Sequence, residues 1–221
     1  MDQTIFFTSI LFPALINGLV ITLQLVVLSA PLGLVLGVGV AVGRQYGSTF
    51  LSGACKVFII FIKGCPLLLL LFTLYFGLPF IGITFNAFTA SVIGFILCSG
   101  AYNSEYIRGA IISVKDGQII AATALGMTRV QAIQHVVMPQ ALRRAVPGLA
   151  NEFIDLIKYS SLAYMVTMVE LSGAGKLVAT KYFTYNETFM AVGVVYLILV
   201  TVTTFGVKMF ERRVAIPGLI S

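Results

Sequence analysis

Three long stretches of this chain carry no charged side chain. Residues 3–43, 64–104 and 188–207 contain no Lys, Arg, Asp or Glu. An uncharged apolar segment of about 20 residues is long enough to cross a bilayer as a helix. Over the whole chain 59% of residues are hydrophobic and 10% are charged, whereas soluble domains are about half apolar and a quarter charged. The sequence therefore predicts an all-α integral membrane protein.

Five membrane-spanning helices are predicted within a single domain, residues 1–221. The expected spans cover about residues 15–42, 57–78, 87–107, 148–169 and 188–208. Pro79, Gly82 and Asn86 separate the second span from the third with residues that favour turns. The first span is expected to be retained, because the N-terminus lacks the basic region and the cleavage site of a signal peptide.

Lysine and arginine collect on one side of this five-span arrangement. That side carries Arg44, Lys56, Arg108, Lys115, Arg129, Arg143, Arg144, Lys208, Arg212 and Arg213. Lys176 and Lys181 fall on the other side. Basic residues mark the cytoplasmic loops of membrane proteins, so we expect the N-terminus outside and the C-terminus inside. The net charge of +6 is accordingly interpreted as topology, and no nucleic-acid partner is expected.

The nucleophilic and metal-ligating residues form no recognisable site. The three cysteines, Cys55, Cys65 and Cys98, are scattered without metal-ligand spacing, and the single histidine, His135, has no acidic or cysteine partner nearby in sequence. An odd, scattered set of cysteines does not indicate a disulfide framework or a zinc site. We therefore predict no metal site and no catalytic residues.

A polar block at about residues 116–147 separates the third and fourth spans. Asp116 is placed to cap a first short helix, and Gly126 is placed to end that helix in a left-handed conformation. Thr128 can then begin a second helix, with Gln131 at the spacing of a capping box. This ordered pattern predicts a helix–turn–helix on the cytoplasmic side.

The second short helix has an apolar face and two prolines after it. Val130, Ile133 and Val137 recur on one face, Pro139 is expected to end the helix, and Pro147 is expected to mark the start of the fourth span. The helix pair either packs against the ends of the chain's own helices or serves as a docking knob for a soluble partner. Both interpretations stay open at this point.

Glycines in the first predicted span indicate close helix contact. Gly33, Gly37, Gly39 and Gly43 give two G-x-x-x-G spacings, which let helices approach closely in lipid. The contact can lie within the subunit or between two subunits. No internal repeat is found, and five helices are few for enclosing a solute pathway, so a dimer is expected.

Several motifs resemble the permease subunit of ABC importers of the polar amino acid type. The segment "GQIIAATALGMT" (residues 117–128) is similar to the family's EAA loop, and the segment "MPQALRRAVPGLANEF" (residues 138–153) is similar to the family sequence that comes after that loop. "FIKGCPLLLLLFTLYFGLP" (residues 61–79) is similar to a family segment that normally reads F-R-G-T-P-L, and "ERR" (residues 211–213) is similar to its terminus. The resemblance covers about residues 14–213.

The resemblance implies a type I ABC importer permease in the cytoplasmic membrane of a prokaryote. In that family the EAA loop forms coupling helices that insert into a groove of a cytoplasmic ATPase subunit. Two permease subunits, identical or homologous, pair with two ATPases that bind ATP and Mg²⁺, and an extracytoplasmic binding protein delivers the amino acid. The implied docking residues here are Gly117, Gln118, Ile120, Ala121, Ala122, Leu125, Gly126 and Pro139.

One position departs from the family pattern. Ile120 stands where the loop's glutamate is expected, which removes a carboxylate suited to a basic residue of the ATPase. An exposed ion pair is worth only about 0–1 kcal/mol, so an apolar contact from Ile120 can offset its loss. Either the groove of the ATPase is more apolar here, or a second, different permease subunit carries the glutamate.

Charged residues near membrane depth are candidates for function by default. They are Lys63, Glu105, Arg108, Glu152, Asp155 and Lys158. They either form structural ion pairs that support the coupling helices or act as a gate that breaks and reforms. The substrate-binding residues are unknown, because the polar side chains at plausible depth form no signature; they are Asn17, Thr22, Gln24, Ser91, Ser99, Tyr102, Asn103 and Thr167.

The segment "SGAGKL" (residues 172–177) does not make this chain an ATPase. A phosphate-binding loop needs a glycine where Glu170 stands and Ser or Thr where Leu177 stands. The predicted function is therefore the translocation subunit of an ATP-driven importer for a polar or charged amino acid, with no enzyme activity or cofactor of its own. The alternatives are a stand-alone channel or secondary transporter for a small polar solute, and a membrane-anchored interaction protein.

Overall fold

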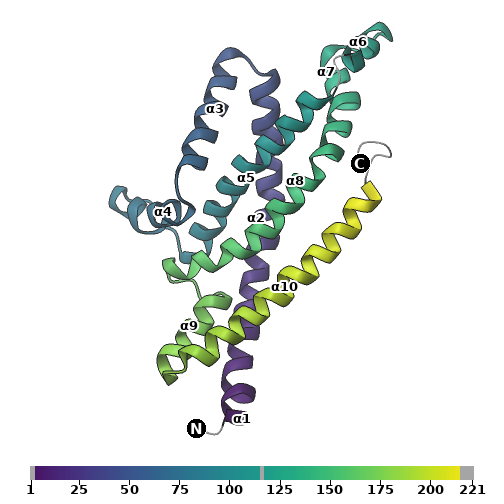
Figure 1. Cartoon of the computed structure of the whole chain (residues 1–221). Helices are drawn as coiled ribbons and strands as arrows, with labels where there is room; N and C mark the ends of the chain where they lie inside the picture. The colour runs from purple at the N-terminus through teal and green to yellow at the C-terminus, as the bar shows by residue number, and fades with distance from the viewer. Residues whose placement is uncertain (1–2, 115–116, 215–221) are drawn as a thin grey trace.

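The computed structural model describes residues 3–114 and 117–214, and every regular element within them is helical. α1 (Gln3–Ile5), a π-helical turn (Phe6–Leu11) and α2 (Phe12–Tyr46) run on from one another at the N-terminus. The later helices are α3 (Thr49–Gly64), α4 (Leu67–Phe72), α5 (Ala87–Ser113), α6 (Gly117–Ala124), α7 (Arg129–Ala132), α8 (Met138–Tyr159), α9 (Leu171–Tyr182) and α10 (Tyr185–Val214). Figure 1 shows α2 running the length of the molecule, with α8 and α10 crossing it obliquely.

Three of the described helices are long and apolar enough to cross a membrane unaided. They are Phe6–Tyr46, Ala87–Ser113 and Tyr185–Arg213. Two bent helix pairs also pass this test, Thr49–Gly64 with Leu67–Ile81 and Arg129–Val166 with Leu171–Tyr182. By length and composition the described chain therefore has between three and five candidate spans.

The second predicted span, residues 57–78, is not one straight helix. α3 ends at Gly64, and the chain turns by 101° before the helix that runs from Leu67 to Ile81. Pro66 explains the break, because a proline has no N–H to donate and pushes the residue before it into extended backbone. Cys65 has that conformation, with φ −92° and ψ 127°. Apolar runs on both sides of the segment from Lys63 to Pro66 hid this turn from a prediction based on hydropathy.

The fourth predicted span, residues 148–169, does not coincide with one straight helix. α8 already starts at Met138, and a 3₁₀ helix (Ser160–Val166) follows it. Thr167 then takes a left-handed conformation with φ 65°, and α9 continues from Leu171 at an angle of 47°. Residues 160–170 therefore form a bend rather than the end of a straight span.

The two prolines also behave differently from the prediction. Pro139 does not end a helix, because it lies in the first turn of α8, where no intrahelical donor is required. A π-helical turn (Ile133–Val137) leads directly into it. Pro147 lies inside α8, and the buried residues Ala145 and Ala150 on either side hold that part of the helix against its neighbours.

Small residues bring α2 and α5 into close contact. A Cβ atom on Gly37 would lie 2.7 Å from the Cβ of Asn103, and one on Gly33 would lie 3.0 Å from the Cβ of Ser99. No L side chain fits at such distances without moving a helix. The seam marked by Gly33 and Gly37 therefore lies within this chain, while Gly39 has no atom within 4 Å of such a Cβ.

Two of the four buried clusters in the described bundle hold α2, α5 and α8 together. The larger cluster joins α2, α4, α5 and α8 through Leu25, Leu71, Phe95 and Leu156. A second cluster, with Ala41, Ile107, Val137 and Ala141 among its members, lies where α2, α5 and α8 meet near α6. This second cluster attaches the block between α5 and α8 to the bundle.

Candidate functional site

Figure 1 shows α6 and α7 at one extremity of the molecule, beside the start of α8. Gly126 has φ 86°, and the N–H groups of Gly126 and Met127 donate to the carbonyls of Thr123 and Ala122 at 3.0 and 3.1 Å. This left-handed ending of the first short helix confirms the role predicted for Gly126. Asp116, the predicted N-cap of α6, lies outside the described residues.

The capping box that begins α7 is also confirmed. Thr128 Oγ1 accepts a hydrogen bond from the N–H of Gln131 at 3.3 Å, and Gln131 Oε1 accepts one from the N–H of Thr128 at 2.9 Å. These reciprocal bonds satisfy two backbone donors at a helix start. Together the two caps fix the turn between α6 and α7. We call residues 117–132 the coupling knob.

One face of the coupling knob is packed against the bundle. Ala122 and Ala132 are buried, and Ile119 packs on the second buried cluster. Arg144 Nη1, from α8, donates to the carbonyl oxygen and the hydroxyl of Ser113 at 2.5 and 3.0 Å. The end of α5 and the start of α8 are therefore tied together directly beneath the knob.

The other face of the coupling knob is free. Ile120 is 67% exposed, Leu125 84% and Val130 61%. Seven of the eight predicted docking residues are exposed, and Ala122 alone is buried: the exposed ones are Gly117, Gln118, Ile120, Ala121, Leu125, Gly126 and Pro139. One face therefore packs against the chain's own helices, and the other is an exposed apolar face of the kind that is typical of an interaction site.

An ion-pair network lies where α2 and α5 meet. Glu105 Oε2 accepts from Arg108 Nη2 at 3.0 Å, one turn along α5, and Glu105 Oε1 contacts Arg44 Nη1 from α2. The sequence placed Glu105 and Arg108 in one set of candidate charges but did not include Arg44. The sequence did carry a signal for this pair. Arg44 and Glu105 each follow directly after a long uncharged run, so both are expected at the same edge of the membrane.

The remaining charged candidates do not join that network. Lys158 Nζ lies 2.5 Å from Asp155 Oδ1 in an exposed pair on α8. Lys63 Nζ lies 4.8 Å from the ring centre of Tyr102. Glu152 is buried, and its Oε1 has no hydrogen-bond partner in the described part of the chain. The structure therefore separates the six predicted residues into two ion-paired groups, with Lys63 and Glu152 in neither.

Glu170 forms a buried polar cluster that sequence reasoning missed. Its carboxylate accepts from the N–H groups of Ser172 and Gly173, which cap α9, and from the hydroxyl of Tyr196 on α10, all at 2.9 Å. Thr22 on α2 donates to it at 3.4 Å. The sequence singled out Glu170 only because it replaces a glycine of the phosphate-loop pattern, yet an acidic residue at a helix start is stabilised by the helix dipole and so is itself a signal.

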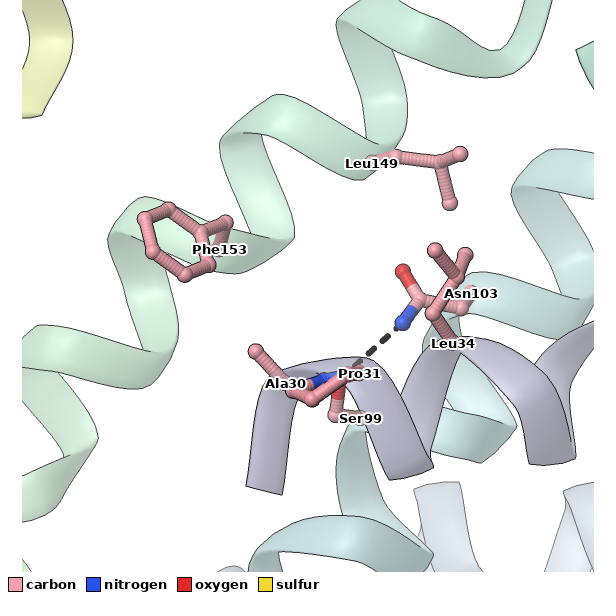
Figure 2. A pocket seen from close by; sticks show the side chains of 7 residues that line it. All are labelled: Ala30, Pro31, Leu34, Ser99, Asn103, Leu149 and Phe153. Carbon is pink, nitrogen blue, oxygen red and sulfur yellow. Dashed lines mark hydrogen bonds between the residues drawn. The ribbon is translucent and has the colours of Figure 1, made fainter. Parts of the chain in front are cut away.

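A cavity of about 280 Å³ lies between α2, α5 and α8 (Figure 2). It is lined by Ala30, Pro31, Leu34, Ser99, Asn103, Leu149 and Phe153. Asn103 Nδ2 donates to Ser99 Oγ at 3.0 Å, while its Oδ1 has no partner among the described residues. Figure 2 shows this oxygen directed away from Ser99 and toward the cavity. Of the polar residues expected at mid-membrane, Ser99 and Asn103 meet here, whereas Thr22 belongs to the Glu170 cluster.

Curated relatives match nearly the whole chain. The probable amino-acid ABC transporter permease protein YckA of Bacillus subtilis (strain 168) is 38% identical over 204 residues, covering 92% of this chain and 90% of that protein. The glutamine transport system permease protein GlnP of Escherichia coli (strain K12) is 37% identical over 206 residues, covering 92% and 94%. The octopine transport system permease protein OccM of Rhizobium radiobacter is 38% identical over 201 residues, covering 85% and 80%.

Solved structures show the same fold. A crystal structure of an amino acid ABC transporter with histidines gives a TM-score of 0.84 at 32% identity, over 91% of this chain and 94% of that chain. The inward-facing MetNI methionine ABC transporter gives 0.80 at 22% identity, over 98% and 100%, and this second likeness shows the fold alone. The family described as "Binding-protein-dependent transport system inner membrane component" matches residues 31–216. The chain therefore belongs to this family, and it is the permease subunit of an ABC importer.

Proposed function

We propose that this chain translocates a polar or charged amino acid by alternating access, driven through the coupling knob by a separate ATPase subunit. The observation that carries the mechanism is the division of the knob into two faces. Ile120 and Leu125 are free on one face, and Ala122 and Ile119 pack into the bundle on the other. The amino-acid class is supported by the names of the relatives, including the glutamine permease GlnP of Escherichia coli.

The packed face can transmit a movement of the knob to the helices of the bundle. The second buried cluster joins the knob to α5 and α8, and Arg144 ties the two helices together at Ser113. Close-packed interiors transmit displacement because they cannot compress. A partner that pulls on the knob would therefore move α5 and α8 as one body, together with the cavity that they line.

The partners are inferred from the family and from the distribution of charge. We infer two ATPase subunits, which bind ATP and Mg²⁺, a second permease subunit that is identical or homologous, and an amino-acid-binding protein outside. The knob lies on the cytoplasmic side of a prokaryotic inner membrane, because basic residues gather at the end of the molecule that carries it. Arg129, Arg143 and Arg144 are among them. In this five-span topology the N-terminus is outside and the C-terminus inside.

The docking role is tested by co-purification with candidate ATPase subunits from the same genome. Leu125→Asp places a charge on the most exposed apolar side chain of the knob. Burying a leucine is worth about 1.5–3 kcal/mol, so we expect retention of the ATPase to fall at least about tenfold. Phe183→Asp is the matched control, because Phe183 is 85% exposed on a different part of the chain, after α9. Equal retention by the Leu125 variant and the wild type would refute docking through the knob.

The Ile120→Glu variant tests the departure from the family pattern. It exchanges an apolar contact worth about 1.5–3 kcal/mol for an ion pair worth about 0–1 kcal/mol. We therefore expect weaker retention of the ATPase if the partner groove is apolar. Tighter retention would show that the groove keeps a basic residue.

Amino-acid uptake in liposomes with the binding protein tests the substrate class, with glutamine and a basic amino acid as the first probes.

A further inference from the structure

An apolar groove runs between α2, α8 and α10. It adjoins the cavity of Figure 2, with which it shares Leu34, Leu149 and Phe153. Two adjoining hollows of about 470 and 310 Å³ share Leu34, Val146, Leu149 and Phe210. The rest of the lining is Val35, Val38, Leu142, Arg143, Ala150, Phe153, Gly206 and Val207. Arg143 is the single charged residue in this lining. We call this feature the α2–α8–α10 groove.

The groove is open because α10 packs loosely against the bundle. In the most apolar 18-residue stretch of α10, only 6% is buried inside the structure. Figure 1 shows the upper part of α10 diverging from α2. Gly206 adds to the opening, since a Cβ built on it meets no atom within 4 Å. In a bilayer an open apolar groove of this kind is in contact with lipid.

The length of the groove fits one lipid chain. Its lining on α8 runs from Leu142 to Phe153, which at 1.5 Å per residue is about 16 Å. The hydrocarbon core of a bilayer is about 30 Å thick, so one leaflet accounts for about 15 Å. The groove therefore spans about the depth of one leaflet.

The end of the groove nearest the coupling knob carries an unpaired positive charge. Arg143 is exposed and makes no hydrogen bond or ion pair to any described residue. Its neighbour Arg144 is bound to Ser113. Phe210 lines the groove beside Arg143, and Arg212 and Arg213 follow in the exposed last turn of α10. The carboxylate of Glu211 lies in the same turn and offsets one of these charges.

We propose that the α2–α8–α10 groove binds an anionic phospholipid. One acyl chain lies along the apolar walls, and the phosphate group lies at Arg143 and the basic last turn of α10. Basic pockets between membrane helices are a recognised form of anionic-lipid site. The second permease subunit is the alternative occupant, and a cross-linking variant distinguishes the two. The proposal does not depend on which solute is transported.

The test uses the purified transporter complex in detergent and native mass spectrometry with phosphatidylglycerol and phosphatidylcholine at equal concentrations. We expect the wild type to retain phosphatidylglycerol in excess. Arg143→Gln should lower that excess about fivefold, the usual effect of one basic residue near a membrane surface, and Arg143→Lys should largely preserve it. Lys56→Gln, which removes an exposed charge on α3, is the matched control and should change nothing.

A second variant distinguishes binding of the lipid's acyl chain from binding of its headgroup. Gly206→Leu fills the open wall of the groove and should lower retention of both lipids. An unchanged lipid preference in Arg143→Gln would overturn the proposal. So would an efficient disulfide cross-link between two copies of a Gly206→Cys variant in the complex, because it would place the second subunit in the groove.

Discussion

Replacing Glu170 with alanine should lower the stability of the fold far more than replacing any exposed carboxylate. The Glu170 side chain is fully buried. It accepts hydrogen bonds from two backbone N–H groups at the start of α9 and from the hydroxyl of Tyr196, each at 2.9 Å. This carboxylate therefore joins the start of α9 to α10, and alanine leaves all three donors without it.

The expected cost is worked out from these contacts. Loss of a helix cap costs about 1 kcal/mol, and leaving a buried donor such as the Tyr196 hydroxyl without its acceptor costs about 1–3 kcal/mol. The cavity left by the Cγ methylene and the carboxyl group adds about another 1 kcal/mol. We expect a total of roughly 3–5 kcal/mol for Glu170→Ala. Glu170→Gln keeps the volume and one acceptor oxygen, and should cost roughly half as much.

Thermal unfolding in detergent measures this difference. For a chain of 150–250 residues, 1 kcal/mol corresponds to about 2–4 °C in the melting temperature, so Glu170→Ala should melt roughly 10 °C lower. The control is Glu187→Ala, an exposed carboxylate in the first turn of α10, which should shift melting by less than about 2 °C. Similar melting of the two alanine variants would refute the role assigned to Glu170.

Three further changes test other contacts by the same unfolding assay. Glu105→Gln should cost about 1–3 kcal/mol, because two partly buried arginines lose a charged acceptor, whereas Asp155→Asn in the exposed pair should cost less than about 1 kcal/mol; equal costs would contradict this ranking. Gly37→Leu should abolish folding, since even a Cβ would lie 2.7 Å from α5, while Gly39→Leu, with open space around it, should fold normally. Gly126→Ala should cost about 1 kcal/mol through its φ of 86°, and no loss would refute strain there.

The parts of the site that the sequence predicted correctly are local ones. Gly126 and the Thr128–Gln131 capping box lie within a few residues of the groups that they satisfy. Glu105 with Arg108 and Asp155 with Lys158, four of the six candidate charges, are each three residues apart on one helix and form ion pairs. Such contacts are fixed by helical geometry, so spacing alone reveals them.

The parts that the sequence missed depend on contacts between distant segments. Arg44 meets Glu105 across a separation of 61 residues, and Thr22 meets Glu170 across 148. The prediction for Pro139 failed because a π-helical turn before it lets the chain continue as a helix. The break at Pro66 was missed because the apolar runs before Lys63 and after Pro66 together have the length of one continuous span.

The sequence by itself determined that this is a helical membrane protein with a capped knob and a glycine seam, because uncharged runs, caps and small residues act locally. Only the tertiary structure decided which surface each of these features faces. Gly33 and Gly37 face α5 within the same chain, Ile119 turns into the bundle, and Ile120 turns out. Neighbouring residues of one helix differ by about 100° in direction, so their roles depend on where the rest of the chain packs.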